Sequence, residues 1–96
     1  MTLARQHIIE EIMQLTGGSW DQVCCACAGI QNTTTLGLVA QQIRARRVWL
    51  DGAKLRVASW VRRDKLDATS LSAVLAVARE GLPLLAGAVA MVTGWE

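Results

Sequence analysis

Apolar residues recur at helical spacing near the start of the chain, and they predict a first helix over residues 3–15. Ile8, Ile12 and Leu15 fall on one side of this segment, and the pair Gly17-Gly18 stops it. A second helix is predicted from Trp20 to Ala28. It follows a Ser-x-x-Gln capping box at residues 19–22 and ends at a glycine, residue 29.

A third helix is predicted over residues 32–46, directly after this glycine. Asn32 or one of the three threonines that follow it can cap the helix. Its apolar positions, spaced i, i+3, i+4 and i+7, are Leu36, Val39, Ala40 and Ile43. The two helices are therefore joined by a short connection that contains glycine.

Residues 47–57 alternate between apolar and polar side chains around Asp51-Gly52, which predicts a β-hairpin with a two-residue type I′ turn. With those two residues as the turn, the predicted cross-strand pairs are Leu50 with Ala53, Trp49 with Lys54, Val48 with Leu55 and Arg47 with Arg56. The inner face then holds Val48, Leu50, Ala53, Leu55 and Val57. The outer face gathers three cations around the indole of Trp49.

Two further helices are predicted after the hairpin. The first is capped by Asp67 or Thr69 and ends at Gly81, and Pro83 suits the first turn of a second helix over residues 83–93. This last helix is apolar almost all round, so it must be covered on most sides. A chain of this length has little material for that purpose, so we expect a homodimer through residues 68–95.

The predicted fold class is therefore mainly α with one β-hairpin. A chain of 96 residues fits one compact unit, in which residues 1–61 form the first part and residues 62–96 a C-terminal helical segment. The N-terminus has charges every few residues and no long apolar stretch, which favours a cytoplasmic protein. The uncharged stretch over residues 82–95 is shorter than the roughly 20 residues that span a bilayer, so no membrane partner is expected.

The cations are concentrated in the middle of the chain. Residues 44–65 hold eight of the ten Lys and Arg residues and only two Asp, while the rest of the chain has a net charge of −4. A basic cluster of this kind is the usual electrostatic signature of phosphate binding, although a solvated charged face has the same composition.

Three cysteines lie close together at positions 24, 25 and 27. On a helix, Cys25 is turned about 100° from Cys24, so three thiolates cannot converge on one tetrahedral ion. Cysteine also packs as a small hydrophobe, and we interpret these residues as structural. No metal, no cofactor and no catalytic residues are predicted, because no catalytic triad order or glycine-rich phosphate loop is present.

Residues 3–60 resemble a winged helix-turn-helix domain of the transcription-regulator type. The resemblance depends on Cys25 as the small residue of the bracing helix, Gly29 in the turn, Ile30 after it, a polar third helix and the basic hairpin. It implies a DNA-binding protein, a transcriptional regulator or a mobile-element accessory factor. Its partner would be double-stranded DNA, with helix 32–46 in the major groove and the wing 47–57 on phosphates.

The nucleic-acid-binding residues expected on this interpretation fall into two groups. Base edges would be met by Gln31, Asn32, Thr34, Thr35 and Gln42. The phosphate-facing group comprises Arg44, Arg46, Arg47, Trp49, Lys54 and Arg56. The alternative is a protein-binding module, such as a small phage-type inhibitor that docks on a larger host complex and buries Trp49 as an anchor.

Overall fold

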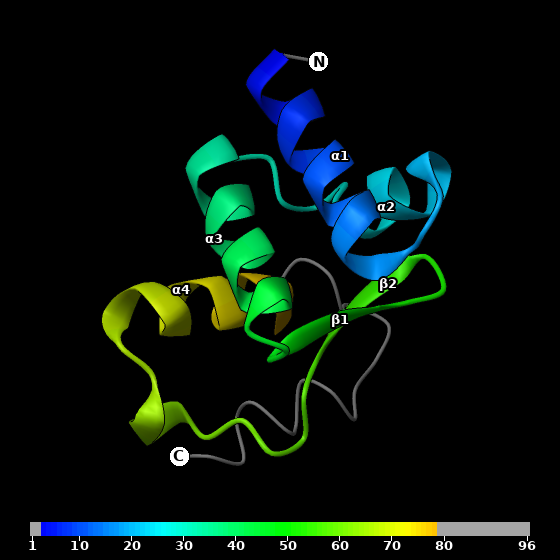
Figure 1. Cartoon of the computed structure of the whole chain (residues 1–96). Helices are drawn as coiled ribbons and strands as arrows, with labels where there is room; N and C mark the ends of the chain where they lie inside the picture. The colour runs from blue at the N-terminus through cyan, green and yellow to red at the C-terminus, as the bar shows by residue number, and fades with distance from the viewer. Residues whose placement is uncertain (1–2, 79–96) are drawn as a thin grey trace.

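The computed structural model describes residues 3–78, and in this range the chain is mainly helical with one antiparallel hairpin (Figure 1). The elements in chain order are α1 (Leu3–Thr16), α2 (Trp20–Ala26), α3 (Thr33–Arg44), β1 (Val48–Asp51), β2 (Lys54–Val57), the 3-10 turn η1 (Arg63–Lys65) and α4 (Ala68–Ala76). The predicted fold class is confirmed at this level. The predicted helix over residues 83–93, and most of the predicted dimerisation segment, lie outside the described residues.

The predicted helix starts are confirmed by their capping bonds. Ser19 Oγ accepts a hydrogen bond from the Gln22 amide at 3.1 Å, and Gln22 Oε1 accepts one from the Ser19 amide at 2.9 Å. Asn32 Oδ1 accepts from the amide of Thr35 at 3.0 Å, and Asp67 Oδ1 accepts from the amide of Ser70 at 2.6 Å. Each cap satisfies an amide that has no partner within its helix.

Two helix ends differ from the prediction. The second helix ends at Ala26 instead of Ala28, because the amide of Ile30 turns back to bond Cys27 O at 3.0 Å. The third ends at Arg44 instead of residue 46, because Arg46 has a left-handed φ of 64°. A left-handed residue directly after a helix is a common helix stop, although it is more often glycine.

Helix α3 lies at the centre of the fold, between α1 and α4 (Figure 1). Helix α2 packs on α1 and on strand β2, and β1 packs on α3. The core between them is aliphatic. Its largest fully buried side chains are Ile9, Ile12, Leu36 and Leu55, followed by seven valines at positions 23, 39, 48, 57, 61, 74 and 77. Burial on two sides leaves α3 only a narrow outward face.

The hairpin forms as predicted, but its turn lies one residue later, so each residue of the first strand pairs two residues further along the second than predicted. The observed cross-strand pairs are Val48 with Val57, Trp49 with Arg56, Leu50 with Leu55 and Asp51 with Lys54. The turn is therefore Gly52-Ala53, and Gly52 has φ +60° while Ala53 is not left-handed. Glycine at the first central position is typical of a type II′ turn, whereas the predicted type I′ turn needs both central residues left-handed.

The shifted register changes what lies on each face of the hairpin. Ala53, predicted on the inner face, is exposed in the turn, while Val48, Leu55 and Val57 are buried against the helices as predicted. Asp51 becomes a paired strand residue beside the cations of the outer face. That face is therefore not purely cationic.

Candidate nucleic-acid interface

The outward face of α3 is a stripe of three residues, the polar Thr34 and Gln41 with the apolar Leu38 between them. Thr34 and Gln41 are exposed and Leu38 is half-buried. Their spacing of four and then three residues places them on one side of the helix. Gln41 was not among the nucleic-acid-binding residues expected from the sequence, although its position seven residues after Thr34 indicates the same helix face.

Gln42 does not lie on this face, which corrects the prediction that it meets base edges. Its side chain is 3% exposed. Gln42 Nε2 donates to Ser70 Oγ at 3.1 Å, and Gln42 Oε1 accepts from Arg47 Nη1 at 3.0 Å. The side chain is fully occupied in joining α3 to α4 and to the start of the hairpin.

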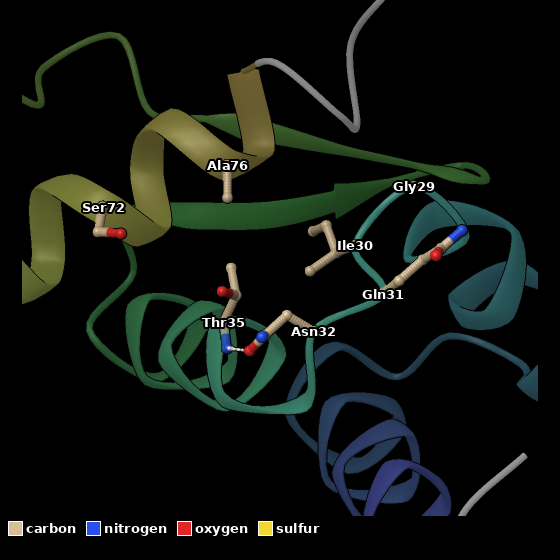
Figure 2. Close-up of a pocket in the computed structure, with 7 residues that line it drawn as sticks. All are labelled: Gly29, Ile30, Gln31, Asn32, Thr35, Ser72 and Ala76. Atoms are coloured by element: carbon tan, nitrogen blue, oxygen red, sulfur yellow. Dashed lines mark hydrogen bonds between the residues drawn. The ribbon is translucent and has the colours of Figure 1, made fainter.

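A pocket of about 520 Å³ lies between the start of α3 and helix α4 (Figure 2). Gln31 and Asn32, both exposed, and Thr35, half-buried, line it from the α3 side. Ser72 and Ala76 line it from α4. These three predicted base-contacting residues therefore lie together, at a pocket edge and not along the outward stripe.

Arg5 of α1 holds the connection between α2 and α3 in place. Its Nη1 donates to Ile30 O at 2.7 Å, and its Nη2 donates to Cys27 O at 2.9 Å. Cys27 O belongs to the end of α2, where helix carbonyls lack partners within the helix. One guanidinium thus ties α1 to the connection that leads into α3.

The predicted phosphate-facing cations differ in how far they are engaged. Arg44 pairs with Glu11 of α1, and Arg56 Nε lies 2.6 Å from Asp51 Oδ2 as a charge contact without hydrogen-bond geometry. All four side chains are substantially exposed, so each pair contributes little to stability.

The remaining predicted cations are Arg46, Arg47 and Lys54. Arg46 is exposed directly after α3, and Lys54 is half-buried on the outer face of the hairpin. Arg47 is half-buried and bonded to Gln42, so it belongs to the interior edge of the surface and not to its outer face.

Trp49 lies on the outer face of the hairpin, opposite Arg56, and is 44% exposed. It borders a groove of about 360 Å³ between the ends of α1 and α3 and strand β1. Leu15, which is 38% exposed, and half-buried Leu50 also line this groove, and Arg46 lies at it. The groove combines an apolar lining with a guanidinium.

The three cysteines face different surroundings. Cys27 is buried and burial raises the pKa of its thiol to about 11, while burial and then Asp21 raise the pKa of Cys24. Cys25 is exposed. In the described part of the chain, no group of three or more His, Cys, Asp and Glu side chains is placed to hold a metal ion.

A thiol reagent at mildly alkaline pH is expected to modify Cys25 first in the folded protein. Cys27 should react only after unfolding, because the thiolate is the reactive form and a thiol with a pKa of about 11 stays protonated under these conditions. Mass spectrometry of digests before and after denaturation measures the order. Native modification of Cys27 as fast as Cys25 would contradict this burial.

These features define a small, mainly helical protein with one antiparallel hairpin and a polar helix face beside basic residues. No family model matches the chain, and comparisons with curated proteins and with solved structures find no match. Over residues 3–78, no helix is both long and apolar enough to cross a membrane.

Proposed function

We propose that the protein binds double-stranded DNA in the manner of a winged helix-turn-helix domain, as a transcriptional regulator or a mobile-element accessory factor. One observation carries the proposal: the outward stripe Thr34–Leu38–Gln41 runs along α3 toward its end, after which Arg44 and Arg46 are exposed and the basic hairpin begins. In this arrangement a helix can enter the major groove while a neighbouring wing contacts phosphates.

The roles of the side chains follow from their chemistry. Gln41 and Thr34 offer amide and hydroxyl groups to base edges, and Leu38 offers an apolar contact to a thymine methyl group. Arg46 and Lys54 neutralise phosphates on either side of the groove. A homodimer through residues 68–95 would place two such surfaces on a palindromic site, and this part of the proposal depends on the sequence alone.

The test is binding to a labelled mixed-sequence duplex, measured by fluorescence anisotropy at several salt concentrations. We expect Arg46→Ala with Lys54→Ala to weaken binding on the order of tenfold at low salt. The slope of log affinity against log salt should fall by about 2, since each lost phosphate contact removes about 0.9.

The matched control is Ala4→Glu with Thr69→Glu, which changes the net charge by the same amount at exposed first turns of α1 and α4. Negative charge is favourable there, so folding should be retained and binding should change much less. Equal weakening by both double variants would show a non-specific charge effect. Unchanged affinity in the Arg46/Lys54 variant would overturn the proposed wing.

The second candidate function is a protein-binding module, such as a small phage-type inhibitor of a host complex. It is favoured by the groove beside Trp49, where an exposed indole borders Leu15 and Leu50, and by the acidic partners of Arg44 and Arg56. Half-exposed tryptophan in an apolar groove is a common interface anchor. Absence of duplex binding even at low salt would put this function first.

A further inference from the structure

A second exposed tryptophan, Trp60, borders a separate pocket that the proposed duplex interface does not use. The pocket has a volume of about 230 Å³ and is lined by Arg47, Trp60, Val61, Arg62, Lys65 and Leu66. The indole is 62% exposed, which is the largest exposure among the big apolar side chains of residues 3–78 after Leu3. Three cations and an indole are thus gathered at one small cavity.

The backbone holds Trp60 outward. Its neighbours Ala58 and Val61 are buried in the core, and the amide of Val61 bonds Ala58 O at 3.1 Å to close a turn around it. The amide of Ala58 in turn bonds Arg47 O at 2.7 Å. The residue that bears the indole and the residue that supplies the inner guanidinium are therefore tied together through the backbone.

The guanidinium of Arg47 is also oriented from inside the protein. Gln42, buried between α3 and α4, accepts its Nη1 hydrogen bond at 3.0 Å, and Ser70 in turn anchors Gln42. This contact engages one of the five N–H donors of the guanidinium and leaves the others directed elsewhere. A side chain oriented in this way loses less conformational entropy when it binds a ligand.

The other two cations come from the turn that precedes α4. Arg62 and Lys65 are exposed and both line the cavity, and the amide of Lys65 bonds Arg62 O at 3.1 Å. Asp64 approaches Arg62 at 3.8 Å, with both side chains about 70% exposed or more, so this pair is weak. Asp67 also reaches Arg47 electrostatically. The cavity keeps an excess of positive charge.

We propose that this pocket binds an unpaired nucleotide of single-stranded nucleic acid, with the base stacked on Trp60 and its phosphate among Arg47, Arg62 and Lys65. Stacking on an aromatic side chain beside cations is how proteins bind single strands without reading their sequence. A base inside a duplex is already covered on both faces by its neighbours, so the indole selects an unpaired base. The volume, below that of sites for whole drug-sized ligands, suits a single base.

The test uses a short fluorescein-labelled oligothymidylate and the full chain, with anisotropy measured from low to physiological salt. Trp60→Ala is expected to weaken binding about tenfold, because it removes the surface on which the base stacks, and Trp60→Phe should retain most of the affinity. Lys65→Ala should lower the slope of log affinity against log salt by about 0.7. Circular dichroism checks that each variant is folded.

Leu3→Ala is the control, because Leu3 is 66% exposed and lies on α1, outside the pocket. Its affinity for the oligonucleotide should fall less than twofold. The inference is overturned if the wild-type protein does not bind the oligonucleotide, if Trp60→Ala binds as tightly as wild type, or if Leu3→Ala weakens binding as much as Trp60→Ala does. Competition by polyglutamate as effective as competition by unlabelled oligonucleotide would also overturn it, in favour of an acidic peptide.

The inference does not depend on the proposed duplex function, and the two fail separately. Trp60→Ala is expected to leave duplex affinity unchanged, while the Arg46/Lys54 double variant should retain the Trp60-dependent part of single-strand binding. Loss of duplex binding in a protein that still binds the oligonucleotide through Trp60 would overturn only the duplex proposal.

Discussion

Gln42→Leu is expected to lower the free energy of unfolding by about 2–3 kcal/mol, despite adding an apolar side chain at a buried position. The substitution removes the acceptor for Arg47 and the donor for Ser70, which are 3.0 and 3.1 Å from the amide group. A hydrogen bond to a charged group contributes about 1.5–3 kcal/mol, and a buried hydroxyl left without its partner adds a further cost. Urea denaturation measures the change.

Gln41→Leu provides a matched control for this prediction. It is the same substitution one residue earlier on α3, but at an exposed position, so its effect on stability should stay within about 0.5 kcal/mol. Duplex binding should show the opposite order: Gln41→Leu should weaken it more than Gln42→Leu, because only Gln41 faces outward. If Gln42→Leu is as stable as Gln41→Leu, the buried amide does not join α3 to α4 as the structure shows.

Arg5→Met should destabilise the protein by about 2–3 kcal/mol. Methionine keeps most of the aliphatic length of arginine but loses the donors to Ile30 O and Cys27 O, which lie 2.7 and 2.9 Å from the guanidinium. Both bonds are charge-assisted, and both carbonyls belong to the connection between α2 and α3. We expect faster amide hydrogen exchange in residues 27–31 as well as a lower urea midpoint.

Gln14→Met is the control for this prediction, because residue 14 is an exposed position of the same helix. Arg5→Lys should fall between wild type and Arg5→Met, since an ammonium group cannot reproduce the fork of a guanidinium that reaches two carbonyls. Equal exchange rates in residues 27–31 of wild type and Arg5→Met would show that the connection is held by other contacts.

The helices were predictable because their signals are local. Spacing of apolar residues defines α1 and α3, and the capping residues Ser19, Asn32 and Asp67 act on amides within three positions of themselves. The hairpin was predictable for the same reason, since alternation and a glycine turn lie within eleven residues. The basic residues of the candidate site could likewise be identified by composition alone.

The hairpin register was not predictable, because Asp-Gly suits two turn types that differ by one residue in position. A type I′ turn has the glycine at its second central position, with Asp51 before it. A type II′ turn has the glycine at its first central position, which is where Gly52 is found. The shift keeps Val48, Leu55 and Val57 on the buried face, moves Ala53 into the turn and brings Asp51 among the cations of the outer face. A hairpin face that includes Asp51 and one that holds only cations and Trp49 therefore differ by a choice that local sequence leaves open.

The amino-acid sequence by itself determined the fold class, the helix starts and the concentration of positive charge, because each of these depends on residues close together in the chain. The tertiary structure decided which polar side chains of α3 are buried. Gln42 became a buried link because α4 packs on that side of α3, and Gln41 became the exposed residue. The tertiary structure also brought Arg47 and Trp60 to one pocket, because the segment after β2 packs beside the segment before β1.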